Sequence, residues 1–482
     1  MFNPRFVLHI LLLTVVLFLC GCSTDDPASP SKNRPPAFAD GMYVSEEYPS
    51  CGEVVRVHAY ASDPDGDELS YSWMVSGGEV LPMDRDSSVE WVLPLESGSA
   101  TIAVNVSDGA EELTQTRTVY TQSVESWTVA LEDLDNAMVS SILDVGNGYT
   151  LLIRSLDNSA QAELWNLGRD GDMYGQESFE EGRLILPLQI LASYWIAGSI
   201  KTNEFDDEFY LAYTTPHREI VWERSWGGDG RQEVRKFVLD DEGSAYVLGN
   251  SESPGGSYLH PVAAKFDRWG DQIWQTELTA GSLEGWVSDG GLVVLPDGRC
   301  IVGYNRMYGR SQAVFAVLDS NGVIQSRMLG ESQASGLNVE NVFELDGIYY
   351  GIAYDEQFLG AGMLWIYNLD PDAGIQASYL TDLDRGIVLS DVILTKDRNL
   401  TAVGYQTDEN DENNTKAILM KVSLDGDVKW IHRFGGQDSA VFHDVVQAND
   451  GSIVCAGELT SSENRQTYPW VVKTNQHGLA DE

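Results

Sequence analysis

Basic residues are scarce in this sequence. The 482 residues include 30 Lys and Arg against 74 Asp and Glu, which gives a formal net charge of −44 at pH 7. The negative electrostatic potential of such a protein repels the phosphates of nucleic acids and the headgroups of anionic lipids. We therefore expect no nucleic acid among the partners and interpret the excess as the solvated acidic surface of a secreted protein. The same excess would also suit a salty habitat or attract cations.

Cysteine is scarce as well, with five in the whole chain. Cys20 and Cys22 lie close to the N-terminus, which leaves Cys51, Cys300 and Cys455 as an odd number scattered along the rest. Cys300 and Cys455 lie on matching strands of a repeated segment, at positions that differ by one residue. Because neighbouring residues of a strand point to opposite faces of a sheet, the two side chains should lie on opposite faces. We therefore expect these two not to pair, and to be small buried hydrophobes.

The sequence patterns of common catalytic centres are missing. The chain has no His-Glu-x-x-His, no Gly-x-Ser-x-Gly, no Walker loop, no Cys-x-x-Cys and no Ser-x-Asp-x-Gly-x-x-Trp box of the sialidase type. Its seven histidines are dispersed, without the spacing of metal ligands. Acidic pairs are so frequent that nearness in sequence identifies no glycosidase pair. We therefore name no catalytic residue and predict no organic cofactor.

The N-terminus carries an export pattern. Arg5 is followed by an apolar run over residues 6–19 and then by Leu19-Cys20-Gly21-Cys22. This segment resembles the lipobox of bacterial lipoproteins, which implies a signal peptide over residues 1–21 and a lipid on Cys22 that anchors the protein to a membrane. An uncleaved anchor helix is the alternative, although the apolar run is short for a span. Ser23 after the cysteine favours the outer membrane, and the polar segment 22–36 is interpreted as a flexible tether.

Alternating strands separated by turn residues fill the region 37–124, which predicts a small β-sandwich. It resembles the PKD and related Ig-like modules of bacteria in its Asp63-Pro-Asp-Gly-Asp67 turn, its Tyr71-Ser-Trp73 and its Val106-Ser-Asp108-Gly109. The resemblance implies a spacer or adhesion module, with Trp73 between the two sheets. Asp63, Asp65 and Asp67 could bind calcium through clustered oxygens, or form a plain turn.

From Trp127 to Glu482 one pattern recurs about seven times, with a period near 50 residues. Each copy has an apolar strand, a strand that ends in glycine, a strand that ends in an Asp/Gly turn, and a strand that carries Trp or Gln. Four short strands per unit at this period are typical of a propeller blade. Seven blades are predicted by the positions of the glycine column, whose first copy has arginine instead: Arg154, Gly198, Gly249, Gly303, Gly351, Gly404 and Gly457.

The phase of the repeat predicts how the ring closes. The last copy ends without a Trp strand, whereas the isolated segment 127–131 matches Trp430–Phe434. We expect this N-terminal strand to complete the last blade and so remove the open edges. We also expect the Trp column, which includes Trp222, Trp274 and Trp430, to pack between blades rather than to stack on sugars.

The repeat also resembles bacterial extracytoplasmic propellers whose units read Trp…Gly-Gly…Asp-Gly…Gly…Lys, with the copy from Trp430 to Lys473 fitting best. The resemblance implies fold and location but little chemistry. The sequence as a whole predicts an all-β protein, in which an Ig-like sandwich is followed by a seven-bladed propeller over residues 126–482.

Two functions are consistent with this reading. The first is a non-enzymatic lipoprotein of the cell envelope whose propeller binds a protein or a glycan. The second is a carbohydrate-active hydrolase or lyase that uses carboxylates around the central funnel. Carboxylates and aromatics that converge on one ring face would favour the enzyme, and a funnel of small apolar residues would favour the binding protein.

Overall fold

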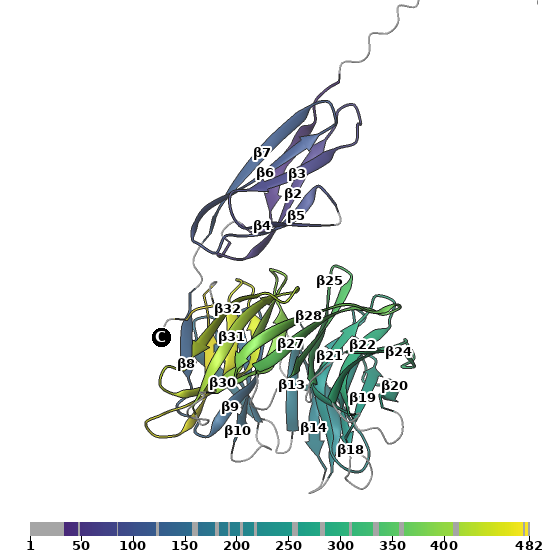
Figure 1. Ribbon diagram of the computed structural model, residues 1–482, viewed down its shortest axis with the longest axis vertical. Coiled ribbons are helices and arrows are strands. Elements are labelled where there is room, and N and C mark those ends of the chain that lie inside the picture. Colours follow the sequence, from purple (N-terminus) through teal and green to yellow (C-terminus); the bar gives the residue numbers. More distant parts are fainter. Residues whose placement is uncertain are drawn as a thin grey trace, which may run out of the picture.

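A computed structural model of the chain describes most of residues 33–480, and the predicted signal peptide, Cys22 and most of the tether lie outside it. The segments it leaves out are 47–48, 84, 122–124, 157–161, 179–182, 191–192, 203–205, 216–218, 253–258, 280–284, 308–310, 331–336, 356–360, 408–413 and 476–477. In the described part every regular element is a β-strand (Figure 1). That part contains no helix long and apolar enough to cross a membrane.

The first unit is formed by two antiparallel sheets. One has the strand order β1-β2-β5-β4 and the other the order β3-β6-β7. The strands are β1 (Ala37–Val44), β2 (Val54–Ser62), β3 (Ser70–Val75), β4 (Glu79–Pro82), β5 (Ser88–Val92), β6 (Gly98–Ser107) and β7 (Glu112–Thr121).

The core between these sheets comes from strict alternation along the strands. In β6 every second residue from Ala100 to Val106 is buried, because its side chain points to the facing sheet. Trp91 on β5 is fully buried in this core, and its indole donates to the carbonyl of Gly77 at 3.0 Å. Trp73 packs against the core but is only partly buried, and it donates to the carbonyl of Asp86 at 2.9 Å. The residue that fills the space between the sheets is therefore Trp91 rather than the predicted Trp73.

The rest of the described chain forms seven four-stranded antiparallel sheets. The first three are β9 (Ala137–Asp144), β10 (Gly148–Ser155), β11 (Ala162–Gly168), β12 (Met173–Ser178); β13 (Arg183–Ile190), β14 (Ser193–Lys201), β15 (Asp207–Thr214), β16 (Ile220–Trp226); and β17 (Gln232–Leu239), β18 (Ala245–Glu252), β19 (Leu259–Phe266), β20 (Gln272–Glu277). The fourth and fifth are β21 (Gly285–Val294), β22 (Cys300–Met307), β23 (Ser311–Leu318), β24 (Ile324–Leu329); and β25 (Leu337–Leu345), β26 (Ile348–Asp355), β27 (Ala361–Asp370), β28 (Gly374–Arg385). The sixth is β29 (Ile387–Leu394), β30 (Asn399–Thr407), β31 (Thr415–Ser423), β32 (Val428–Phe434), and the seventh holds β33 (Ser439–Gln447), β34 (Ile453–Thr460), β35 (Thr467–Lys473).

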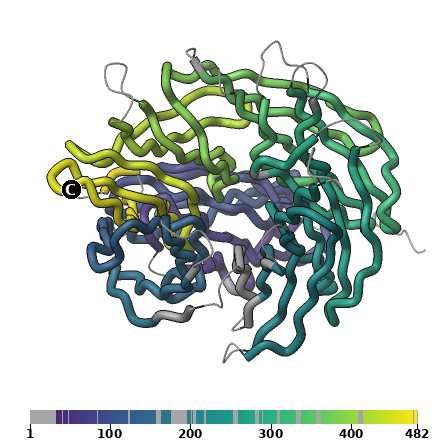
Figure 2. The backbone as a smooth tube through the Cα atoms, turned by 90° about the horizontal axis from the view of Figure 1, so that it is seen from below, coloured from purple at the N-terminus to yellow at the C-terminus, as the bar shows by residue number. Residues whose placement is uncertain are grey.

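These sheets form a closed, propeller-like ring (Figure 2). The fourth strand of the seventh sheet is β8 (Trp127–Ala130), which comes directly after the sandwich in the sequence. It pairs antiparallel with β35, with Trp127 opposite Lys473 and Ala130 opposite Trp470. The pairing expected from the match between the two segments is therefore present, and an N-terminal strand completes the C-terminal sheet.

The first strand of each sheet lies innermost, where strands of neighbouring sheets contact one another. Polar side chains there, among them Ser288, bond to the backbone of the next sheet. Asn341 donates to the carbonyl of Val392 at 2.9 Å, Asp391 accepts from the amide of Val445 at 3.3 Å, and Asp444 accepts from the amide of Ile142 at 2.8 Å. Because each bond joins two sheets, these inner polar groups hold the ring together.

The glycine column lies on the second strand of its sheets, where a side chain would clash with the inner strand or, as at Gly351 beside Phe315, with a neighbouring sheet. A Cβ atom on Gly404 would lie 2.0 Å from the carbonyl oxygen of Val388. Gly404 pairs with the residue just before a β-bulge in the first strand. In the first sheet, the residue that faces the equivalent bulge is Ile153, so the arginine predicted for this column, Arg154, is one residue out of register.

The Trp column packs between sheets, as expected. Trp274 on β20 is only 8% exposed, and its indole donates to the carbonyl of Ser320 in the next sheet at 3.1 Å. A Cβ atom on Gly322 of that sheet would lie 2.6 Å from the Trp274 ring. Trp127 in β8 repeats the arrangement across the closure, with Gly171 of the first sheet beside its ring.

Cys51, Cys300 and Cys455 are free and buried, which confirms the expectation for Cys300 and Cys455. Burial raises the pKa of the Cys300 thiol to about 12 and that of Cys455 well above its usual range. Both thiols therefore stay protonated and behave as apolar core groups.

A candidate ligand site between the third and fourth sheets

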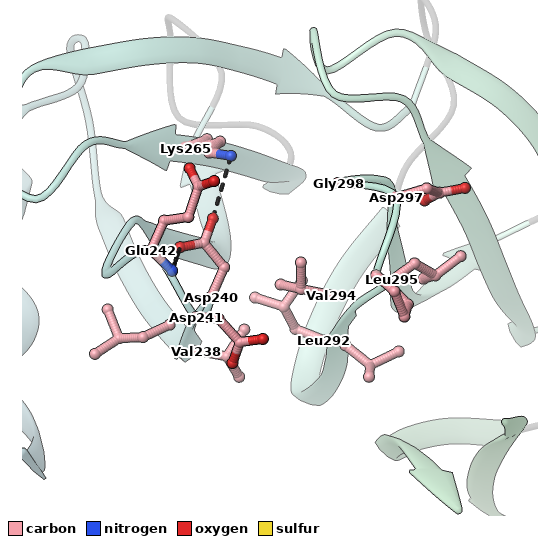
Figure 3. A pocket seen from close by; sticks show the side chains of 13 residues that line it. Val238, Asp240, Asp241, Glu242, Lys265, Leu292, Val294, Leu295, Asp297 and Gly298 are labelled. Atoms are coloured by element: carbon pink, nitrogen blue, oxygen red, sulfur yellow. Dashed lines mark hydrogen bonds and ion pairs between the residues drawn. The ribbon is translucent and has the colours of Figure 1, made fainter. Parts of the chain in front are cut away.

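A cavity of about 620 Å³ opens between the third and fourth sheets (Figure 3). Two turns form it, and each joins the first strand of a sheet to the second: residues 240–244 after β17, and residues 295–299 after β21. Because the sheets are antiparallel and repeat around the ring, such turns all lie on one side, which we call the turn face. Cavities of this size are typical of ligand sites, which fall within about 300–1,000 Å³.

The turn after β17 is built around one aspartate. Asp240 accepts hydrogen bonds from the amides of Glu242 at 3.1 Å and Ser244 at 2.7 Å. Its other carboxylate oxygen lies 3.3 Å from Nζ of Lys265 on β19, which also donates to the hydroxyl of Tyr246 at 2.6 Å. Burial acts to lower the pKa of Lys265, but the bonds to Tyr246 and Asp240 outweigh it and raise that pKa above its ordinary value. Asp240 and Lys265 thus neutralise each other.

A similar lysine–aspartate pair recurs in the sixth and seventh sheets, with the aspartate at the third position of the turn, where the third sheet has Glu242. Lys421 on β31 pairs with Asp397, and Lys473 on β35 lies 2.9 Å from Asp450. Both aspartates lie in the turn between the first and second strands, as Asp240 does. The pair is therefore a structural element of the repeat that ties the third strand to this turn, and it is not specific to the cavity.

The remaining charges at the cavity are carboxylates. Asp241 and Glu242 are exposed at its edge on one turn, and Asp297 is exposed on the other (Figure 3). Asp297 accepts from the amide of Arg299 at 3.1 Å and from its guanidinium at 2.7 Å, which holds its pKa below the usual range. Arg299 also bonds to Asp372 of the fifth sheet at 2.6 Å.

The cavity wall is aliphatic. It is formed by the side chains of Val238, Leu292, Val294, Leu295 and Pro296, and none of the lining residues is aromatic. Carboxylates beside such a wall can hold a cationic group whose apolar part lies along the aliphatic side chains.

The aspartates predicted to bind calcium are only partly brought together. Asp63 and Asp67 come together with Asp108, and one oxygen of each lies within 4.8 Å of the others. Asp65 turns away to Arg34, whose guanidinium nitrogen lies 2.7 Å from it. The hydrogen bond to Arg34 holds the pKa of Asp65 below its ordinary value. Calcium at this turn remains a prediction, with Asp108 in the place of Asp65.

Neither the cavity nor one exposed aromatic residue was predicted from the sequence. Trp269, in the turn between β19 and β20, is 62% exposed and does not belong to the packed Trp column. The guanidinium of Arg268 lies 5.1 Å from its ring centroid. Its place in an Asp267–Asp271 turn, outside the strand that carries the column, is the signal that could have set it apart.

The sandwich contacts the same turn face at another place (Figure 1). A Cβ atom on Gly451, in the turn after β33, would lie 3.5 Å from the amide nitrogen of Glu53 at the start of β2. Burial at this contact raises the pKa of Glu53. The turn face therefore holds both the sandwich and the cavity.

No protein-family model and no curated protein sequence matches the chain. Among solved structures, the chain is similar to a quinoprotein alcohol dehydrogenase-like protein from Bacteroides thetaiotaomicron, with 12% identity, a TM-score of 0.37, and coverage of 83% of this chain and 96% of that one. It is also similar to the subtype N10 neuraminidase-like protein of a bat influenza A virus from Guatemala, with 9% identity, a TM-score of 0.42, and coverage of 73% and 99%. The polysaccharide lyase Uly1 has 9% identity and a TM-score of 0.42, with coverage of 70% and 90%. No activity carries over to this chain from any of these neighbours.

Proposed function

We propose that the protein is a non-enzymatic, lipid-anchored binding protein of the cell envelope. In this proposal Cys22 carries the lipid, the segment 22–36 is the tether, an Ig-like sandwich is the spacer, and a seven-bladed propeller binds a protein or a glycan. The observation that carries the proposal is the cavity on the turn face, a concave site with charged groups on an aliphatic wall.

The strand orders support the two domain assignments. The orders β1-β2-β5-β4 and β3-β6-β7 correspond to the ABED and CFG sheets of an Ig-like constant-type sandwich. Seven successive four-stranded sheets, the last one completed by β8, correspond to the blades of a closed propeller. The proposed localisation in the cell envelope rests on the lipobox-like segment ending at Cys22, together with a net charge that suits an exported protein. Mass spectrometry of the mature N-terminus tests it, and an unmodified chain that begins at Met1 would refute it.

Two inner carboxylates favour binding over hydrolysis. Asp391 and Asp444 lie on innermost strands, where a funnel-based hydrolase would place its acid and base. Each accepts from two backbone amides, Asp391 from Val392 and Val445, and Asp444 from Val445 and Ile142. A carboxylate bonded in this way holds the ring together and is poorly placed to transfer protons to a substrate.

A capture experiment tests the proposed function. The purified protein would be incubated with envelope extract and, in parallel, with a glycan array, and bound material would be assayed for turnover. We expect a ligand that is retained intact, and that is lost when Pro296 at the edge of the cavity is replaced by Trp. The control is Glu463→Trp, an exposed position in the turn between β34 and β35, which should retain the ligand. A captured glycan that is cleaved would instead support the hydrolase or lyase.

A further inference from the structure

The charge balance of the cavity is negative. Asp240 is neutralised by Lys265, and Arg299 is shared between Asp297 and Asp372. The exposed carboxylates Asp241 and Glu242 then remain as an excess on one side, with Asp297 across the opening (Figure 3). A cation that enters between the two turns would meet carboxylates from both sheets.

The wall matches the apolar part of a long basic side chain. Leu292 and Leu295 are buried, and Val238 and Val294 are half-buried between the two turns. Lys and Arg carry three or four methylene groups below the charged head and bury them readily along aliphatic surface. We propose that the cavity binds a lysine or arginine side chain presented by a protein partner. This inference rests on the proposed function, because it names the ligand class of the same site.

A protein partner fits the cavity better than a glycan does. Sugar rings are usually held on aromatic faces, and none of the lining residues is aromatic. The net charge of −44 adds a long-range field that draws a basic protein surface toward this one. The cavity supplies the specific contact that this general attraction lacks.

The test uses a basic decapeptide containing four lysines and the same peptide with every lysine acetylated, because acetylation removes the charge and keeps the methylene stem. Binding to the purified full-length protein would be measured by calorimetry at physiological salt. The variant Asp241→Asn/Glu242→Gln removes two charges at the cavity. The matched control Glu132→Gln/Asp133→Asn removes two charges from an exposed acidic pair between β8 and β9. All these residues are exposed, so both variants should fold and melt like the parent.

We expect the cavity variant to bind the lysine peptide about fivefold to tenfold more weakly than the parent, in line with about 1 kcal/mol for exposed and half-buried ion pairs. The control variant should lose less than twofold, and the acetylated peptide should not bind. Equal losses in the two variants, or undiminished binding of the acetylated peptide, would overturn the proposal, because the attraction would then be general or independent of charge.

Three further outcomes separate this inference from the proposed function. A partner from envelope extract could bind the Asp241→Asn/Glu242→Gln variant with the same affinity as the parent. That result would refute the binding of a basic side chain in the cavity and leave the proposed function standing. A neutral glycan captured at the same cavity would do the same. If the parent captures no ligand and yet binds the lysine peptide through the cavity carboxylates, the preference of the cavity for a basic side chain is confirmed, and the proposed function, with the protein partner, is refuted.

Discussion

Truncation of Trp127 tests whether β8 closes the ring. Its indole donates to the carbonyl of Arg169 in the first sheet at 2.8 Å, and its ring centroid lies 6.2 Å from that of Tyr149 in an edge-to-face arrangement. Replacement of a buried Trp by Ala costs about 3–5 kcal/mol, and one hydrogen bond accounts for about 1 kcal/mol of such a loss. Because Trp127 is half-buried, we expect the lower part of that range, about 3 kcal/mol, for Trp127→Ala.

The measurement is differential scanning calorimetry of the full-length protein, in which the sandwich and the ring can unfold as separate transitions. A loss of about 3 kcal/mol should lower the ring transition by about 6 °C, using about 2 °C per kcal/mol for a large domain. Trp274→Ala, at a junction between consecutive sheets, should lower it by at least as much. Trp269→Ala, at a 62% exposed position, should change it by less than about 1 °C.

The reasoning fails if Trp127→Ala melts like the parent while Trp274→Ala shows the expected loss. The ring would then be held by the contacts among its inner strands, and β8 would cover an edge without closing it. Deletion of residues 126–131 provides the stronger form of the same test. It should abolish the cooperative ring transition, since β35 would lose its outer partner over Trp470–Lys473 and become an open edge.

Two further predictions concern the aspartates. The ion pair with Lys421 outweighs burial and lowers the pKa of Asp397 below its ordinary value of 3.8, so its stabilisation is complete above pH 3.8 and is lost as the pH falls through the lower folded-state pKa. The melting temperature of Asp397→Asn should therefore lie below that of the parent near neutral pH and approach it in acid. A difference in melting temperature that does not depend on pH would contradict this. Calcium titration followed by calorimetry should show one site that is lost in Asp63→Asn and Asp108→Asn and kept in Asp65→Asn, because Asp65 is bound to Arg34. If the parent releases no heat with calcium, the segment is a plain turn.

The repeat could be predicted because its signals are local. A strand that alternates buried and exposed residues, a glycine where backbones approach, and a Trp at a fixed distance from a turn all appear within one copy of about 50 residues. The match between 127–131 and Trp430–Phe434 even located the closing strand, since a strand carries its pairing pattern in its own side chains.

Contacts between segments that lie far apart in the sequence were not predictable in the same way. Trp73 and Trp91 both lie on strands of the sandwich, and only the packing of the two sheets decides that Trp91 is the buried one. Asp108 joins Asp63 because a later turn of the sandwich folds back beside the first, and Arg34 draws Asp65 away. Nothing in the local sequence ranks these alternatives.

The sequence alone determined that this chain is an all-β protein built from a recurring four-stranded unit, because strand periodicity and turn residues act over short distances. Only the tertiary structure decided where a ligand can enter. The cavity exists because the turns that contain Asp241 and Asp297 belong to neighbouring sheets, and the packing angle between those sheets sets the space between the two turns. The space between the two turns depends on the packing of the whole ring, and no single copy of the repeat encodes it.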